Sequence, residues 1–253
     1  MKYYNYEFTT RQDFKAIGEI TQLTRGVIVE IPCGGGRLIP LHMNHSRRVY
    51  MVDLEPKMIE LCRKRIERRK ETQRIIPQIG NLLNWQPSEV LGLILIPRGG
   101  IQLLKTKEEI KKSITNLVNK LGKNGTMYID IAMPWSYGKK DSKQIPDFMK
   151  LGDQNEITGL KIFFLPRNRK LIRKFDSKIL DDQLIVKFYF EIVSSTNKII
   201  DSYSMENKWL KIEKADLDQY FSSIGISNIS YFGNYNLDLY DNYSSRLICI
   251  AKK

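Results

Sequence analysis

Histidine and cysteine are scarce in this sequence, and each scarcity excludes a class of site. The only histidines are His42 and His45, which argues against a zinc centre or a histidine-based catalytic triad and predicts no metal site. The three cysteines, Cys33, Cys62 and Cys249, are odd in number, widely spaced and form no CxxC pair. That pattern is typical of reduced thiols in a cytoplasmic protein rather than of a disulfide framework.

Long hydrophobic runs are also missing. A membrane-spanning helix needs about 20 apolar residues, whereas the longest run here, residues 90–97, has the length of one buried strand. The first residues, MKYYNYEFTT, are aromatic and polar and do not resemble a signal peptide. We therefore expect a cytoplasmic protein with no membrane association.

Acidic residues are outnumbered by basic ones. Of 253 residues, 41 are Lys or Arg and 28 are Asp or Glu, which gives a formal net charge of +13. A basic chain is compatible with nucleic acid, anionic substrates or a membrane surface, and equally with a solvated surface bias. The hydrophobic fraction of 42% is enough for a real core and excludes a disordered chain.

The first half of the chain alternates short apolar runs with amphipathic segments. The alternation predicts parallel strand–helix–strand units with right-handed crossovers. Strands are expected at residues 27–31, in the run that ends at Asp53, within 75–83, at 90–97 and at 126–134, and helices around 14–23, from Leu38 onward, over 58–71 with Pro56 in the first turn, and over 107–121.

The pattern changes after Pro134. A polar loop, SYGKKDSKQIPD, leads into alternating β-rich runs over residues 159–212, which predict an antiparallel meander with turns at Asp181-Asp182 and Thr196-Asn197. A short helix is expected at 215–223. Strands at 226–232 and 246–251 then predict an antiparallel pair that returns to the main sheet.

The strongest chemical signal combines a glycine loop with an acid on the next strand. Residues 30–37, EIPCGGGR, lie between a predicted strand and a helix, where glycine lets the backbone approach a ligand closely. Asp53 ends the following strand, at the spacing of about 20 residues where an acid accepts hydrogen bonds from ribose hydroxyls. Both sites belong at the carboxyl edge of the sheet.

The loop is neither a phosphate-binding P-loop nor a good dinucleotide fingerprint. No GK[ST] follows it, and the third glycine of GxGxxG is missing at its spacing. The acid Glu30, just before the glycines, suits a ligand that carries a cation. S-adenosylmethionine is such a ligand, with a ribose, an ammonium and a sulfonium.

On these residues the sequence resembles the class I S-adenosylmethionine-dependent methyltransferases, of the small-molecule or peptide natural-product type. The resemblance covers roughly residues 25–135 and 213–253. The matching segments are EIPCGGGR, VDLEPKMIELCRKR, GNLLNW, LILIPRGGIQLL, LGKNGTMYIDIAMP and the terminal DLDQYFSSIGISNISYFGNY and SRLICIAKK.

The resemblance implies a Rossmann-like α/β fold, with a seven-stranded, mostly parallel sheet, an antiparallel C-terminal strand and an antiparallel β-cap. It implies a single methyltransferase domain over 1–253. Its parts would be an N-terminal aromatic lid or helix (1–25), a cofactor-binding half (26–135), a β-rich substrate cap (136–212) and a C-terminal helix and strand pair (213–253).

The resemblance also assigns cofactor-binding residues. Glu30 would face the methionine ammonium, and Gly34 and Gly36 would line the path of the methionine and ribose, with Cys33 as a small packing residue in the same loop. Asp53 would hold the ribose hydroxyls. The adenine would be met by Leu54, Asn81 and Leu82, and Pro97 and Arg98 would lie between cofactor and substrate. Many relatives have Asp at the position of Asn81 and a small polar residue at that of Arg98.

The acceptor atom is less constrained. Methyl transfer depends mainly on proximity and orientation, but a hydroxyl usually needs a general base. The resemblance places Gln102 where the family sometimes has a histidine, so an amine, which loses its proton to water, is favoured over a hydroxyl. Tyrosines could act as weak bases, which keeps O-methylation open; candidates for a catalytic role are Arg98, Gln102 and Tyr6.

Basic and aromatic side chains are candidates to line the substrate site. They are Phe8, Arg98, Gln102, Trp135, Arg167, Arg169 and Phe175. The expected partner is a small-molecule or peptide substrate. Nucleic acid is disfavoured, because no RNA-binding module is appended and IPRG replaces the Asn/Asp-Pro-Pro-Tyr/Phe motif of nucleic-acid amine methyltransferases. The basic helix at 63–74 is then a solvated face, and the oligomeric state stays open.

Overall fold

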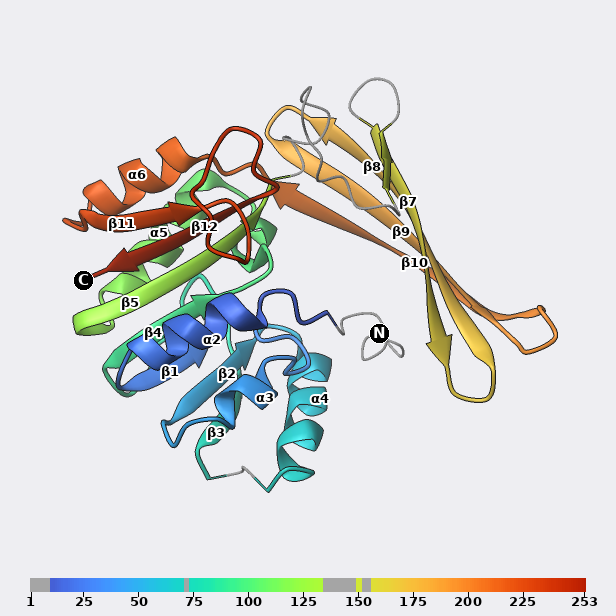
Figure 1. Cartoon of the computed structure of the whole chain (residues 1–253), viewed down its shortest axis with the longest axis horizontal. Coiled ribbons are helices and arrows are strands. Elements are labelled where there is room, and N and C mark those ends of the chain that lie inside the picture. The colour runs from blue at the N-terminus through green and yellow to red at the C-terminus, as the bar shows by residue number, and fades with distance from the viewer. Residues whose placement is uncertain (1–9, 71–72, 134–148, 152–155) are drawn as a thin grey trace. The chain divides into compact units, whose positions relative to one another are not determined.

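The computed structural model describes residues 10–70, 73–133, 149–151 and 156–253 (Figure 1). The chain divides into two compact units. One is an α/β unit formed by residues 10–132 and 212–253, and the other is a β-unit within residues 133–211. Each is described by itself.

A seven-stranded sheet forms the centre of the α/β unit. Its strand order is β11-β12-β5-β4-β1-β2-β3. β3, β2, β1, β4 and β5 pair in parallel, and β12 runs antiparallel to both β5 and β11. This is the predicted mostly parallel sheet with an antiparallel C-terminal strand. The strands are β1 (Val27–Glu30), β2 (Val49–Asp53), β3 (Ile75–Ile79), β4 (Leu91–Ile96), β5 (Leu121–Ala132), β11 (Asn228–Phe232) and β12 (Arg246–Lys252).

Helices connect these strands. α2, α3 and α4 bury their apolar side chains in one cluster with the central strands, in which Ile17, Ile39 and Ile59 are at most 1% exposed. α5 packs against α6 and β5. The bounds are α2 (Phe14–Leu23), α3 (Ile39–His42), α4 (Pro56–Glu67), the 3-10 helix η1 (Gly100–Leu103), α5 (Lys107–Val118) and α6 (Lys214–Ser222).

Three elements differ most from the predicted bounds. α5 ends at Val118 rather than at residue 121, because Leu121 already belongs to β5. α4 ends at Glu67 rather than at residue 71, because Lys70 adopts a left-handed φ of 57° that a helix cannot continue. β5 starts five residues early. Leu121 already pairs with Leu91, and the backbones of Asn124 and Gly125 bond to that of Lys253, so Gly122 and Gly125 lie inside a strand.

The β-unit is a five-stranded antiparallel sheet in the order β10-β9-β8-β7-β6. Its last four strands are the predicted meander, and φ is positive at Asp181 and Asn197, in the two predicted turns. Phe190 is 1% exposed and stacks on Tyr203 with the ring centroids 4.5 Å apart. The strands are β6 (Met149–Leu151), β7 (Glu156–Leu165), β8 (Arg169–Leu180), β9 (Gln183–Val193) and β10 (Ile199–Leu210).

No helix in the described residues is long and apolar enough to cross a membrane. All three cysteines are free and buried.

Candidate active site

The glycine loop after β1 depends on two backbone conformations that favour glycine. Gly34 and Gly36 have φ values of 53° and 79°. A Cβ at Gly36 would lie 2.5 Å from Ile39 Cδ1 and 3.0 Å from Cys62 Sγ, so a side chain there would collide with α3 and α4. The Cys33 N–H donates to the Val52 carbonyl at 2.8 Å, which ties the loop to β2.

Asp53 meets this loop at the carboxyl end of β2. Its Oδ2 accepts the Gly34 N–H at 2.7 Å and its Oδ1 accepts the Glu55 N–H at 3.0 Å. The side chain is 8% exposed, and burial raises the pKa of Asp53, while these backbone bonds favour the charged form. The structure therefore brings together the two sequence signals, with a carboxylate against the backbone of the glycine loop.

Glu30 is a second carboxylate beneath the loop. It is 2% exposed, and its Oε2 lies 2.9 Å from Nε2 of His42, which is fully buried. Burial raises the pKa of Glu30, and the contact with His42 opposes that rise. His42 lies in the helix predicted to begin at Leu38, and nothing in the spacing shows that this helix brings it to Glu30 on β1.

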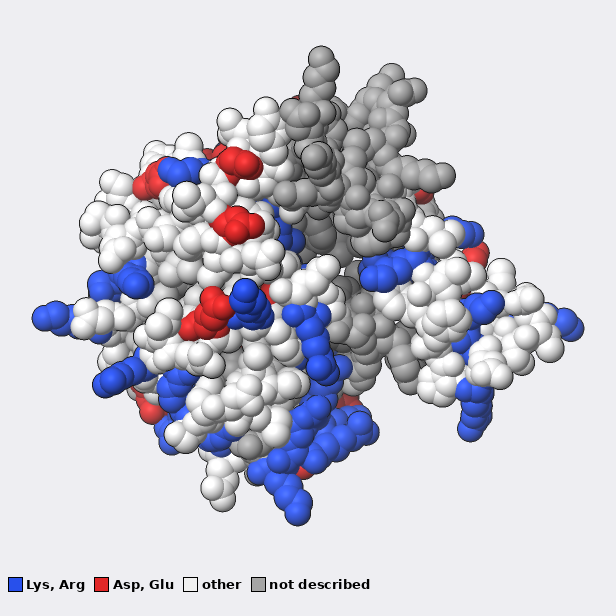
Figure 2. Space-filling view, viewed as in Figure 1, with Lys and Arg blue, Asp and Glu red and all other residues white. Residues whose placement is uncertain are grey.

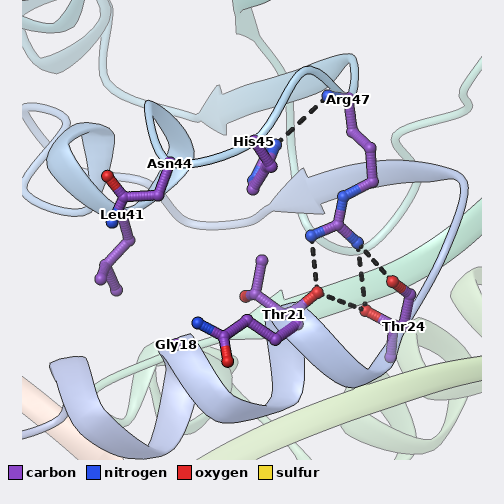
Figure 3. A pocket seen from close by; sticks show the side chains of 8 residues that line it. Gly18, Thr21, Thr24, Leu41, Asn44, His45 and Arg47 are labelled. Atoms are coloured by element: carbon purple, nitrogen blue, oxygen red, sulfur yellow. Dashed lines mark hydrogen bonds between the residues drawn. The ribbon is translucent and has the colours of Figure 1, made fainter.

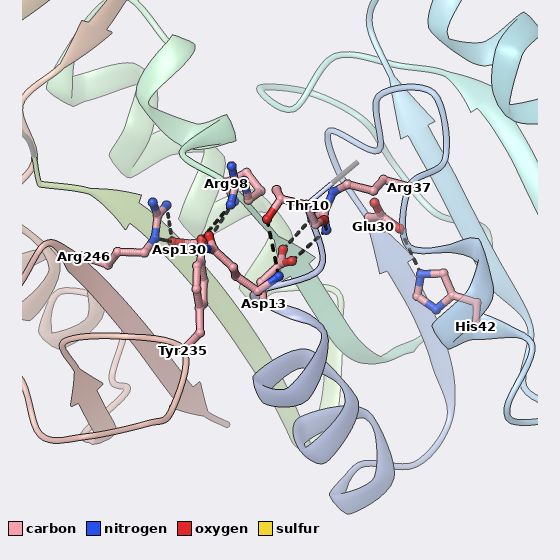
Figure 4. Close-up of polar contacts among 10 residues, drawn as sticks. Thr10, Asp13, Glu30, Arg37, His42, Arg98, Asp130, Tyr235 and Arg246 are labelled. Carbon is pink, nitrogen blue, oxygen red and sulfur yellow. Dashed lines mark hydrogen bonds and ion pairs between the residues drawn. The ribbon is translucent and has the colours of Figure 1, made fainter. Parts of the chain in front are cut away.

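Arg37, the last residue of the loop motif, interacts electrostatically with Glu30, but its hydrogen bonds go to the residues before α2. Its Nη1 donates to Asp13 Oδ1 at 2.7 Å and to the Thr10 carbonyl at 3.0 Å, and its Nη2 donates to Asp13 Oδ2 at 2.5 Å (Figure 4). Asp13 is fully buried. This bidentate pair ties the residues before α2 to the glycine loop, and sequence reasoning missed Asp13 because the two partners are far apart in the chain.

A second polar cluster lies where β4 and β5 end (Figure 4). Fully buried Asp130 accepts the backbone N–H of Arg98 at 2.9 Å, the hydroxyl of Tyr235 at 2.9 Å and Nε of Arg246 at 2.5 Å. The Arg98 side chain is exposed, and its Nη1 lies 3.4 Å from the Tyr235 hydroxyl. Burial, and then Asp130, raise the pKa of Tyr235, so its hydroxyl stays protonated.

Of this cluster, sequence reasoning named only Arg98. Asp130 had a usable signal, because it is the lone acid in the apolar strand TMYIDIAMP. Gln102 is fully buried beside it, and both ends of its amide bond to the backbone of Ala132, the oxygen at 2.8 Å and the nitrogen at 3.1 Å. We therefore read Gln102 as a residue that holds the end of β5.

The predicted adenine neighbours follow β2 and β3. Leu54 is 63% exposed beside Asp53, and Leu82 is buried. Asn81 Oδ1 accepts the Leu83 N–H at 2.9 Å, which shapes the loop after β3. Pro97 is buried at the end of β4.

Cys33 is 4% exposed, and burial raises the pKa of its thiol, which agrees with packing rather than nucleophilic chemistry.

The other predicted substrate residues fall outside the α/β unit. Arg167 is exposed in the turn before β8, and Arg169 Nε donates to the Pro166 carbonyl at 3.1 Å. Phe175 is 6% exposed in a cluster with Leu184 and Val186. Tyr6, Phe8 and Trp135 lie outside the described residues. The substrate-binding roles of these residues, of Arg98 and of Gln102, and the catalytic roles considered for Tyr6, Arg98 and Gln102, stay predictions.

Comparison with known proteins gives matches in structure alone. No family model and no curated protein sequence matches the chain. Among solved structures, DesVI of Streptomyces venezuelae is similar with a TM-score of 0.74 at 14% identity, over 98% of this chain and 95% of its own. CalS10 of Micromonospora echinaspora, described as an amino pentose methyltransferase with S-adenosylmethionine bound, has a TM-score of 0.72 at 13% identity, over 98% and 94%.

The chain has the fold of these methyltransferases. KedS8 of a Streptoalloteichus species, described as a sugar N-methyltransferase, is also similar, with a TM-score of 0.68 at 14% identity over 94% of this chain and 84% of its own. The match covers both units, so the predicted Rossmann-like architecture with an additional antiparallel β-sheet is confirmed.

The residues at the glycine loop fit S-adenosylmethionine. Gly36 lets the loop pass close to α3 and α4, where a Cβ would collide, and Asp53 offers carboxylate oxygens at the sheet edge where a ribose diol would bind. Glu30 contributes a second buried acid, and the guanidinium of Arg37 is held by Asp13. The donor set therefore suits a ligand with a ribose and a positively charged amino-acid end.

Proposed function

We propose that this protein is an S-adenosylmethionine-dependent methyltransferase that N-methylates an amine of a small molecule or peptide natural product. The observation that carries the proposal is the junction of Gly34 and Asp53 at 2.7 Å above buried Glu30. Bound S-adenosylmethionine would supply an electrophilic methyl group on a sulfonium, and S-adenosylhomocysteine would be the product.

The chain's own residues bind the cofactor and hold it in position for the transfer. Asp53 takes the ribose hydroxyls, Glu30 supplies negative charge near the methionine ammonium, and the glycines let the backbone approach. Positioning of this kind accounts for most of what a methyl transfer needs, because the reacting atoms only have to be held in line.

The preference for an amine rests on the groups at the ends of β4 and β5. Asp130 is occupied by Arg98, Tyr235 and Arg246, and Tyr235 has a raised pKa, so neither is poised to take a proton from a hydroxyl. Both histidines belong to α3 and the loop after it. One similar structure is described as an amino pentose methyltransferase and another as a sugar N-methyltransferase, which supports an amino sugar as the first acceptor to test. O-methylation of a small molecule is the alternative.

Calorimetric titration with S-adenosylhomocysteine tests the cofactor assignment. We expect binding, and we expect Asp53→Ala to weaken it about 10- to 100-fold, because a hydrogen bond to a charged group is worth about 1.5–3 kcal/mol. Asp201→Ala, an exposed acid on β10, is the matched control and should bind as the parent does. No binding by the parent would refute the enzyme assignment, and equal affinity of Asp53→Ala would refute the role of Asp53.

The acceptor is tested by mass spectrometry of products from an amino sugar and from its hydroxyl counterpart. Methyl addition to the amine alone supports N-methylation. Addition to the hydroxyl sugar, or to neither while S-adenosylhomocysteine still binds, contradicts the acceptor assignment and leaves the cofactor assignment standing.

A further inference from the structure

A separate cavity lies at the opposite edge of the α/β unit from the glycine loop. Its volume is about 260 Å³, and it opens between α2 and the loop that follows α3 (Figure 3). Thr24 and Arg47 lie just before the amino ends of β1 and β2, respectively. Gly34 follows the carboxyl end of β1, and Asp53 is the last residue of β2. The lining residues are Gly18, Thr21, Gln22, Thr24, Leu41, Asn44, His45 and Arg47.

Arg47 brings a positive charge to this cavity. Its guanidinium caps the end of α2, with Nη2 donating to the Thr21 carbonyl at 2.6 Å and Nη1 to the Thr24 carbonyl at 2.8 Å. These partners are neutral, and no Asp or Glu is among the residues that line the cavity. Burial lowers the pKa of Arg47, yet a guanidinium stays protonated at neutral pH. The charge of Arg47 is therefore not matched by an acid in the cavity wall.

His45 presents a hydrogen-bond donor to the same space. The Arg47 backbone N–H donates to His45 Nδ1 at 3.3 Å, so the ring proton of a neutral His45 must sit on Nε2. Burial, and then the neighbouring cation Arg47, lower the pKa of His45 to about 4, which keeps the ring neutral at pH 7. Nε2 is buried and has no hydrogen-bond partner.

Thr21 contributes a second polar atom without a partner. Its side chain is 4% exposed on α2, and Oγ1 has no hydrogen-bond partner although a hydroxyl both donates and accepts. Figure 3 shows Thr21 and His45 projecting into the cavity from α2 and from the loop. Buried polar groups are rarely left unpaired, so two such atoms lining one cavity indicate a ligand that supplies the acceptors.

We propose that this cavity is a binding site for a small organic carboxylate. One carboxylate oxygen accepts from His45 Nε2–H and the other from Thr21 Oγ–H, and the single negative charge offsets that of Arg47. A monoanion matches one guanidinium and two neutral donors, whereas a phosphate dianion would keep an unbalanced charge. The side chain of Leu41 adds an apolar part to the lining, against which a short apolar tail can pack. This site shares no residue with the proposed methyltransferase site.

The test uses the full chain labelled with ¹⁵N and the imidazole signals of its two histidines, with propionate as the probe. At neutral pH and constant ionic strength, we expect the His45 Nε2 signal to shift and saturate below about 100 mM propionate, the weak affinity that so few atoms allow. Propionamide, which has the same shape and no charge, should give no saturating shift.

Two variants at Thr21 distinguish the loss of the hydroxyl group from a general disturbance of the fold. Thr21→Val should raise the half-saturating propionate concentration about tenfold, and Thr21→Ser, which restores the hydroxyl, should return it to that of the parent. A shift that grows linearly without saturation, an equal response to propionamide, or an unchanged midpoint in Thr21→Val would each overturn the proposal and leave water as the occupant. S-adenosylhomocysteine affinity should stay unchanged in both variants.

Discussion

At the scale of single residues, the glycine loop is the most constrained part of the α/β unit. Gly36 combines a positive φ with contacts that leave no room for a Cβ, because α3 and α4 both approach it. Gly225 also has a positive φ, of 75°, but nothing lies within 4 Å of its Cβ position. Substitutions at these two glycines therefore distinguish the cost of backbone strain alone from the cost of strain combined with a steric collision.

We expect Gly36→Ala to destabilise the protein by about 2–5 kcal/mol, since left-handed strain and overpacking add. Gly225→Ala should cost only about 1–2 kcal/mol from strain. Urea unfolding followed by circular dichroism measures both values. Equal losses in the two variants would show that the contacts with Ile39 and Cys62 do not matter.

The pair of Glu30 and His42 is the other residue-scale prediction. Both side chains are buried, so removing one partner leaves an uncompensated polar or charged group. His42→Ala should cost about 3–5 kcal/mol, and adding Glu30→Gln should recover part of that loss because the buried charge is removed. A double-mutant cycle from urea unfolding measures the coupling. If the losses in the free energy of unfolding are strictly additive, Glu30 and His42 do not stabilise each other.

At the scale of elements, local sequence signals predicted most helices and strands, and tertiary pairing decided their ends. Residues 121–125 have the composition of a turn, yet they extend β5 because Leu91 and Lys253 supply pairing partners. α3 is only four residues long and presents His42 to Glu30, which hydrophobic periodicity does not reveal. The β-meander was predictable, because alternation and turn residues are local signals.

The start of α5 allows an element-scale prediction. Thr106 is its N-cap, and Thr106 Oγ1 accepts the Glu109 N–H at 3.1 Å. Thr106→Ala should lower the free energy of unfolding by about 1 kcal/mol, and Thr106→Ser should keep it near the parent value. Thermal unfolding compares the three proteins. A loss in Thr106→Ser as large as in Thr106→Ala would show that the cap bond is not responsible.

At the scale of the whole molecule, the net charge of +13 is spread unevenly. Lys and Arg side chains gather over α4 (Figure 2), where Arg63, Lys64 and Arg68 are exposed. The partly buried cations Arg37 and Arg246 are instead paired with the fully buried Asp13 and Asp130. The charge of α4 is thus on a solvated face, as expected from the sequence, and the charges that shape the candidate site are the buried ones.

Neutralising this face tests the nucleic-acid alternative. The triple variant Arg63→Gln, Lys64→Gln, Arg68→Gln should bind S-adenosylhomocysteine within about twofold of the parent, because exposed charges are screened beyond about 10 Å at 0.1 M salt. The parent should not be retained on immobilised tRNA at about 150 mM salt. Retention that the triple variant loses would instead favour an RNA substrate.

The sequence by itself determined the strand–helix alternation, the β-meander, and the pairing of a glycine loop with an acid one strand later. These follow from local periodicity and from the rule that parallel strands bring their carboxyl ends to one edge. Only the tertiary structure decided the partners of the buried charges, Asp13 with Arg37, Glu30 with His42, and Asp130 with Arg246. Such pairs join residues that are distant in the chain, and burial, which local sequence does not encode, makes each partner necessary.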